Sequence, residues 1–311
     1  MRAAAEGKIN DRVLISGHPI YPGYIIRGSR RSLMIEAGLN VLGPRYLTQI
    51  GDFLQGAGKL DGLAVTHGHY DHIGALPFLK RKIPRLEVRA HESTGKLLEN
   101  ERVARTMNFL SDQTSQYFSE MDLEKANADE IRIGSVEFSE PLREGDVIDL
   151  GDFSCEVIST PGHTKDHLSF FLREPGILFP GEALGNPIME REDLVKVEFL
   201  TSFPDYVRSI EKLTALLPAV KVIAMSHLYF YTGGDVPRFM EMALRDANAY
   251  RSLIETYLNM ENGDVEKATA SMVRVEYDEK KAVYQERNAY VANLTAQVKA
   301  VAALISPRSM Q

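Results

Sequence analysis

The sequence contains a run of residues that can bind metal ions, His67-Gly68-His69-Tyr70-Asp71-His72. Three of the chain's 8 histidines fall in this run, which directly follows an apolar segment, 62–66, that predicts a buried strand. A divalent metal needs neutral imidazoles and carboxylates that converge at about 2.0 to 2.2 Å, and a strand end followed by a glycine-containing loop can supply several of them. Histidines on a polar surface loop would serve no packing purpose. We therefore interpret the run as the centre of a metal site.

Three more segments place His or Glu directly after a predicted strand. They are Thr160-Pro161-Gly162-His163-Thr164, Phe179-Pro180-Gly181-Glu182 and Ala224-Met225-Ser226-His227. Ligands gather at the loops beyond strand ends in layered α/β proteins, so we expect His163, Glu182 and His227 to form one composite site with the first run. Each of these residues alone would more often be structural or solvated, so the prediction depends on the set.

The pattern of apolar segments predicts an α/β protein with a sheet-on-sheet core flanked by helices. Residues 12–37 are expected to form two strands, the second running from Tyr24 past Gly28 to Ile35. Helices are expected near 44–55, 73–79 and 203–217. Further strands are expected at 86–90, 131–133, 136–138, 147–150, 153–158, 168–172, 177–179 and 220–225.

Two other segments are helical in pattern. Residues 92–127 are polar and predict a helical insertion, which either lies over the site or forms a surface pair with no role in the reaction. Residues 236–305 are wholly helical in pattern, and the last helix carries an apolar stripe that is expected to seal a domain or a dimer interface. We predict a catalytic domain over 1–235, with the insertion, and a helical region over 236–311.

Composition narrows the range of partners. The 311 residues carry a net charge of −7 without a dense basic run, which argues against nucleic acid and favours a small-molecule substrate. The sequence shows no apolar leader and no stretch of about 18 apolar residues, so we expect a cytoplasmic protein without membrane contact. The single cysteine, Cys155, alternates with Phe153 and Val157 on a predicted strand and is expected to be a buried structural thiol.

The ordered set H-x-H-x-D-H, P-G-H-T, an acid after a strand end, and S-H resembles the metallo-β-lactamase-fold hydrolases over roughly residues 12–232. The resemblance implies a four-layer αββα sandwich, here with a C-terminal helical appendage. It implies that His67, His69 and His163 hold a first metal ion, that Asp71, His72 and His227 hold a second, and that Glu182 bridges the two.

Two glutamates depart from the pattern of this family. Relatives carry Asp where Glu182 stands, and the extra methylene moves the carboxylate by more than about 1 Å. Relatives also carry an Asp-x-Gly that braces the ligand loop, where this chain has Glu36-Ala37-Gly38. Both differences bear on the distance between the metals and on which metal binds.

The resemblance implies a dinuclear hydrolase similar to glyoxalase II and the lactonases. Two divalent ions, expected to be zinc with iron or manganese as alternatives, would activate a bridging hydroxide against a lactone, a thioester or a related acyl compound. Asp71 would also serve as the catalytic acid or base. The C-terminal helices would shape substrate entry or form a homodimer.

The alternative function is iron-dependent oxidoreduction with oxygen or sulfur substrates on the same fold. Flavodiiron relatives carry Glu at the second histidine of the first motif, where this chain has His69. Dioxygenase relatives use one iron and lack the pair that corresponds to His72 and His227. A binding module without metal would not need the complete ligand set. Metal analysis separates these three hypotheses.

Overall fold

The computed structural model of the chain describes residues 1–116, 132–134, 136–283 and 285–305. Its backbone divides into two compact units. The first unit comprises Met1–Ser159, Asp166–Gly181 and Leu216–Val236, and the second comprises Thr160–Lys165, Glu182–Ala215 and Pro237–Gln311. The predicted domain boundary at residue 235 stays a prediction.

The first unit contains a six-stranded mixed sheet. Its strands, in spatial order, are β2 (Gly7–Asn10), β3 (Val13–His18), β4 (Tyr21–Arg27), β5 (Ser32–Ile35), β6 (Gly62–Ala64) and β7 (Glu87–Arg89). Strands β2 to β5 are antiparallel, and β6 and β7 continue the sheet in parallel with β5. The prediction of one strand from Tyr24 to Ile35 was wrong, because the backbone N–H of Gly28 donates to the carbonyl of Arg31 at 3.1 Å and closes a turn there.

A seven-stranded sheet completes the first unit. Its strands, in spatial order, are β1 (Arg2–Ala4), β15 (Tyr229–Thr232), β14 (Val222–Ala224), β11 (Ile177–Phe179), β10 (Leu168–Leu172), β9 (Ser154–Ser159) and β8 (Val147–Asp149). The strands predicted at 131–133 and 136–138 were wrong for the residues that are described there. Ile133 is buried, but its N–H and C=O pair with the side chain of Asn108, at 2.8 and 2.6 Å, and not with a neighbouring strand.

Apolar residues on both faces of the six-stranded sheet explain the layered core. Tyr24 and Ile26 of β4 belong to a cluster shared with the seven-stranded sheet, whereas Ile25 between them belongs to a second cluster. Because side chains alternate across a strand, one strand can serve both layers. The predicted sheet-on-sheet core with flanking helices is confirmed. Within it, Cys155 is fully buried, and burial raises the pKa of its thiol well above the ordinary range, as expected of a structural cysteine.

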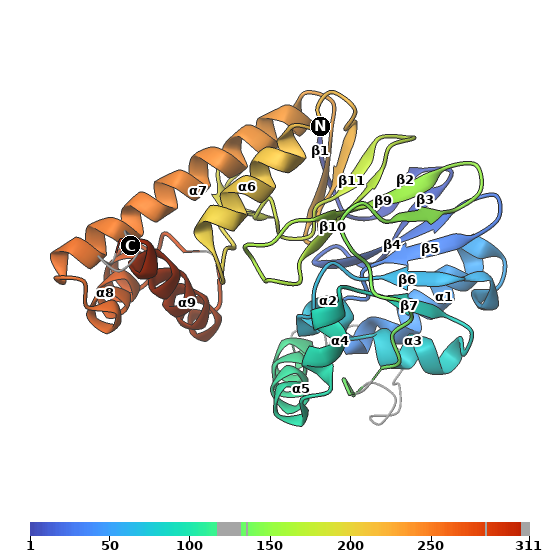
Figure 1. The fold of residues 1–311 in the computed structure, drawn as a ribbon, viewed down its shortest axis with the longest axis horizontal. Helices are drawn as coiled ribbons and strands as arrows, with labels where there is room; N and C mark the ends of the chain where they lie inside the picture. The colour runs from blue at the N-terminus through green and yellow to red at the C-terminus, as the bar shows by residue number, and fades with distance from the viewer. Residues whose placement is uncertain (117–131, 135, 284, 306–311) are drawn as a thin grey trace. The chain divides into compact units, whose positions relative to one another are not determined.

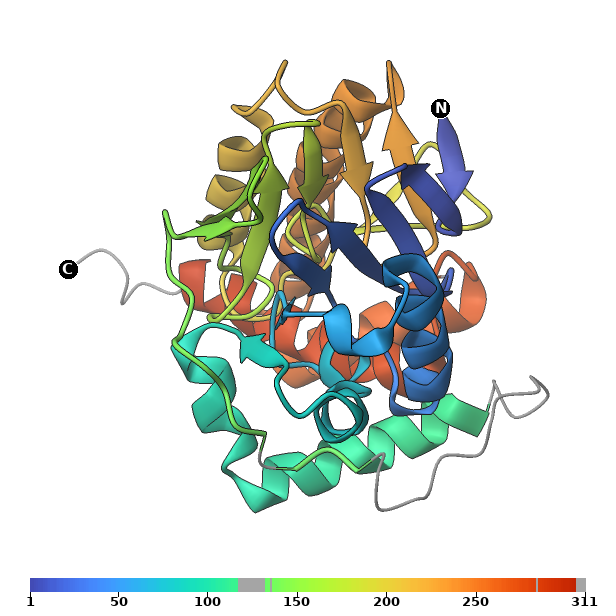
Figure 2. The same cartoon turned by 90° about the vertical axis from the view of Figure 1, so that its right-hand side faces the viewer.

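Five of the described α-helices contribute residues to the cluster that contains Ile25, and Figures 1 and 2 draw them in blue to green. They are α1 (Gly43–Leu54), α2 (Tyr70–Ile73), α3 (Leu76–Lys82), α4 (Glu92–Leu98) and α5 (Glu101–Ser115). Helices α4 and α5 match the first part of the helical insertion predicted over 92–127, and residues 117–127 lie outside the described residues.

The second unit is mainly helical. Its elements are β12 (Asn186–Pro187), β13 (Val195–Lys196), α6 (Phe203–Thr214), most of α7 (Asp235–Met260), α8 (Val265–Met272), a π-helical segment (Val273–Glu279) and α9 (Arg287–Ile305). The predicted stripe of α9 is buried at Leu294, Val298 and Val301, which confirms that the stripe packs within a core.

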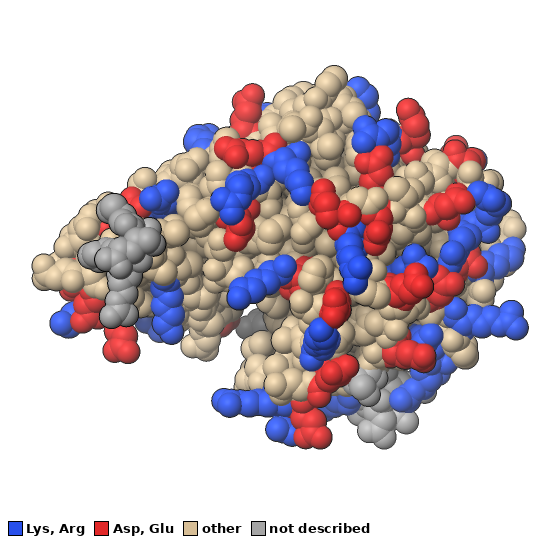
Figure 3. Space-filling model, viewed as in Figure 1, with Lys and Arg blue, Asp and Glu red and all other residues tan. Residues whose placement is uncertain are grey.

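The surface charge and the hydropathy of the helices match what the amino-acid composition indicates. Figure 3 shows basic and acidic side chains interspersed over the face that it draws. None of the described helices is both long and apolar enough to cross a bilayer. The location in the cytoplasm, the absence of a nucleic-acid partner and the homodimer stay predictions.

Candidate metal centre

The first histidines of the ligand run lie in a loop between β6 and α2 that is fixed at several points. His67 is buried, and its Nδ1 lies 2.9 Å from the hydroxyl oxygen of Thr66, while its Nε2 lies 2.9 Å from Nδ1 of His69. The N–H of Gly68 donates to Oδ2 of Asp166 at 3.2 Å, and the hydroxyl of Thr94 donates to the same oxygen at 2.6 Å. Asp166 therefore holds the loop at its glycine.

Asp71, His72 and His227 form a three-ligand cluster within the first unit. One ligand atom from each lies within 4.8 Å of the others, and Oδ2 of Asp71 is 3.9 Å from Nε2 of both histidines. The ligands of one tetrahedral zinc ion lie roughly 3.3 Å apart. The cluster is therefore slightly wider than a metal-bound one, and small side-chain movements would close it.

The other ring nitrogen of each histidine has a protein acceptor. Nδ1 of His72 donates to Oε2 of Glu36 at 3.0 Å, and Nδ1 of His227 donates to the carbonyl of Ile20 at 2.6 Å. These bonds place the proton on Nδ1 and leave the lone pair of Nε2 beside Asp71, which is the arrangement that metal-ligating histidines usually show. The three residues fit a divalent metal ion.

Glu36 braces His72, as the resemblance implied. Its side chain is almost fully buried, and its backbone adopts a left-handed conformation with φ of 70°, which is costly for a residue with a Cβ. The N–H of Ala37 next to it donates to the carbonyl of His72 at 2.8 Å. Backbone and side chain together thus fix the position of His72.

We expect Glu36→Gln to weaken zinc binding by between about 10- and 100-fold, because a neutral amide orients His72 less firmly and polarises it less. Competition with a chromophoric chelator measures the affinity. Glu92→Gln is the matched control, since Glu92 pairs with Lys96 on the surface of α4. Equal affinities in the wild type and in Glu36→Gln would show that Glu36 does not support a metal ligand.

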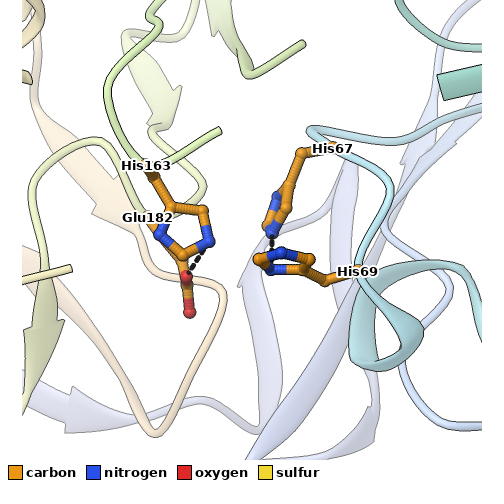
Figure 4. A group of neighbouring side chains, drawn as sticks. All are labelled: His67, His69, His163 and Glu182. Carbon is orange, nitrogen blue, oxygen red and sulfur yellow. Dashed lines mark hydrogen bonds and ion pairs between the residues drawn. The ribbon is translucent and has the colours of Figure 1, made fainter. Parts of the chain in front are cut away.

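His163 and Glu182 form a second pair, within the second unit. Nε2 of His163 lies 2.7 Å from Oε2 of Glu182, and Nδ1 of His163 donates to the carbonyl of Glu198. The preceding Gly162 has φ of +136°, and a Cβ there would lie 2.4 Å from Cα of Tyr206, so only glycine fits at this turn. Figure 4 shows this pair and the pair of His67 and His69.

Each predicted ligand thus has a neighbour from the predicted set. His67, His69, Asp71, His72 and His227 lie in the first unit, and His163 and Glu182 lie in the second. The metal-binding roles of the seven residues stay predictions.

The histidines that were not predicted as ligands have structural positions. Nδ1 of His91 accepts from the N–H of Ser93 at 3.1 Å and thereby caps the first turn of α4. His167 is buried, and its ring stacks on that of His67 with centroids 5.1 Å apart.

Sequence reasoning missed three polar residues around the ligands, Asp166, Asn186 and Glu198. A signal existed for Asp166, which lies beside His167 just after the P-G-H-T motif. No local signal distinguishes Asn186 or Glu198 from ordinary polar residues, because their roles depend on long-range contacts.

Comparison with known proteins gives the family. The model described as the metallo-beta-lactamase superfamily matches residues 21–227. The chain is 32% identical over 200 residues to the acyl-coenzyme A thioesterase MBLAC2 of Gallus gallus, a match that covers 62% of this chain and 66% of that protein, slightly less than two thirds. It is 47% identical over 72 residues to a hydroxyacylglutathione hydrolase of Hahella chejuensis, covering 19% of this chain and 28% of that protein.

A solved structure agrees on the fold. A metallo-beta-lactamase family protein from Thermus thermophilus superposes with a TM-score of 0.59 at 18% identity, covering 90% of this chain and 87% of that one. At this identity the likeness concerns the fold alone.

Proposed function

This chain belongs to the metallo-beta-lactamase superfamily, and from that premise we propose that it is a dinuclear metal-dependent hydrolase of thioesters. The observation that carries the proposal is the cluster of Asp71, His72 and His227, in which both histidines present Nε2 beside a carboxylate oxygen. We assign these three residues to one ion. His67, His69, His163 and Glu182 would hold the other.

The donor set favours zinc. Five imidazoles and two carboxylates suit zinc better than magnesium or calcium, which prefer all-oxygen sites. Iron and manganese are also compatible with imidazole and carboxylate ligands, so the metal content has to be measured. When bound, two such ions lower the pKa of a water molecule and polarise the carbonyl that it attacks.

Two observations support a thioester as the substrate. Both relatives are named as enzymes that act on thioesters, an acyl-coenzyme A and a hydroxyacylglutathione. A thiol has a pKa of about 8.5, so the thiolate leaves readily near neutral pH without a strong general acid. An alkoxide would need a proton donor, for which the described ligand cluster offers Asp71 only.

In this proposal, three groups of the chain position the metal ligands and one ligand also transfers a proton. Glu36 and the carbonyl of Ile20 hold His72 and His227 in the tautomer that can bind an ion. Asp166 holds the loop of His67 and His69 in place. The side chain of Asp71 is 18% exposed, so its second oxygen can take up the proton that the attacking water loses.

We expect the zinc-loaded protein to hydrolyse an acyl-coenzyme A or an acylglutathione at least about 10²-fold faster than a lactone or an oxygen ester of the same acyl group, because the thiolate is the better leaving group. Thiol release, followed with a chromogenic disulfide, measures both thioesters. Faster hydrolysis of the lactone would show that lactones, and not thioesters, are the preferred substrate class. Bound iron with oxygen consumption and no hydrolysis would favour the oxidoreductase.

A further inference from the structure

Glu182 belongs to a buried polar network that extends beyond the predicted ligands. Nδ2 of Asn186 donates to Oε1 of Glu182 at 2.7 Å and lies 3.4 Å from Oε1 of Glu198. The ammonium of Lys196 lies 2.5 Å from the same oxygen of Glu198. Glu182, Asn186 and Glu198 are each at least nine-tenths buried, so their contacts act with little screening by water.

The backbone places Asn186 against Glu182. The N–H of Gly185 donates to the carbonyl of Glu182 at 3.0 Å, and Gly185 has φ of +72°, so the chain turns back after the acid. A Cβ on Gly185 would lie 2.5 Å from the carbonyl oxygen of Lys196. Asn186 then pairs with Lys196 across the two strands β12 and β13. One turn and one strand pair therefore assemble the network.

The chemistry of the network fixes the orientation of the amide. Only the NH₂ end of Asn186 can face two carboxylate oxygens, because an amide oxygen would be repelled by both. Oδ1 consequently points away from both carboxylates.

One of the two buried glutamates has a cationic partner, and the other has a neutral one. Lys196 compensates the charge of Glu198. Asn186 is neutral, so it directs Glu182 without neutralising it, whereas a lysine or arginine at this position would compete with a metal ion for the carboxylate. One oxygen of Glu182 is thus occupied by a neutral donor, and the other, Oε2, lies beside Nε2 of His163.

We propose that Asn186 is a positioning residue that occupies Oε1 of Glu182 and leaves Oε2 as the single metal-binding oxygen. This explains how the chain uses Glu182 where its family carries Asp: the amide immobilises the longer side chain. The pair of Lys196 and Glu198 holds the amide in turn. The inference rests on the proposed metal site, but it concerns how Glu182 binds and not which substrate is hydrolysed.

The test compares wild type with Asn186→Leu, which removes the donor at similar size, and with Asn186→Ala, which removes it without any risk of overpacking. Asn248→Leu is the control, because Asn248 is exposed on α7 and donates to the carbonyl of Leu244 in its own helix. Three quantities are measured: zinc affinity by chelator competition, the visible absorption of the cobalt-substituted protein, and the melting temperature of the metal-free protein.

We expect both Asn186 variants to bind the weaker ion about 10- to 100-fold less tightly and to change the cobalt spectrum. The metal-free melting temperature should fall by only about 2 to 4 °C, the cost of one lost hydrogen bond to Glu182. Unchanged zinc affinity and spectrum would overturn the inference and leave the metal site standing. A much larger loss of metal-free stability would overturn it in favour of a structural role. A wild type that binds no metal would overturn both proposals.

Discussion

Asp71→Asn is expected to lower kcat/KM for thioester hydrolysis by about 10²- to 10³-fold and to reduce the bound metal from two ions towards one. The amide is nearly isosteric, so the fold should be unaffected. It has no charge to hold an ion between His72 and His227, and it cannot accept a proton. Metal analysis after dialysis and thiol-release kinetics measure the two effects.

The control for this substitution is Asp112→Asn, because Asp112 pairs with Arg132 at the surface. It should leave both readouts unchanged, since exposed ion pairs contribute little. Two metal ions and wild-type kinetics in Asp71→Asn would remove Asp71 from the site. Loss of activity with both ions retained would restrict its role to proton transfer.

The second large effect concerns stability. Gly17→Ala is expected to lower the free energy of unfolding by about 3 to 5 kcal/mol, because two costs combine. Gly17 has φ of +85°, and a Cβ there would lie 2.2 Å from Cε1 of Tyr46. The ring of Tyr46 is fully buried and its hydroxyl donates to the carbonyl of Tyr21 at 2.5 Å, so the ring cannot easily move away. Urea unfolding measures the difference.

Gly7→Ala separates the two costs. Gly7 also has a positive φ, +74°, but a Cβ there would meet nothing within 4 Å. Its substitution should cost only about 1 kcal/mol, the conformational part. If Gly17→Ala lowers the free energy of unfolding by no more than Gly7→Ala, the ring of Tyr46 can move away from the backbone of β3.

The predicted ligands were accessible from the sequence because their signals are local. His67, His69, Asp71 and His72 stand within one loop, and strand β6 before them is apolar on both faces. Residue types and spacing alone therefore indicated metal chemistry. The helix predicted at 44–55 was confirmed as α1 for the same reason, since apolar periodicity is a local property.

Features that depend on distant contacts were not predictable. β4 and β5 were merged because both are apolar, and only the turn at Gly28 shows that they are antiparallel neighbours. Ile133 has the character of a strand residue, yet the side chain of Asn108 takes its backbone hydrogen bonds. Asn186 contacts Glu198 from 12 positions away, and neither residue belongs to a motif.

Zinc dependence is measured by titrating the metal-free protein with zinc and following thioester hydrolysis at each point. We expect no activity after chelation and full activity only when about two zinc ions are bound per chain. Full activity in the metal-free protein, or no hydrolysis after two zinc ions are bound, would show that the chain is not a dinuclear zinc thioesterase.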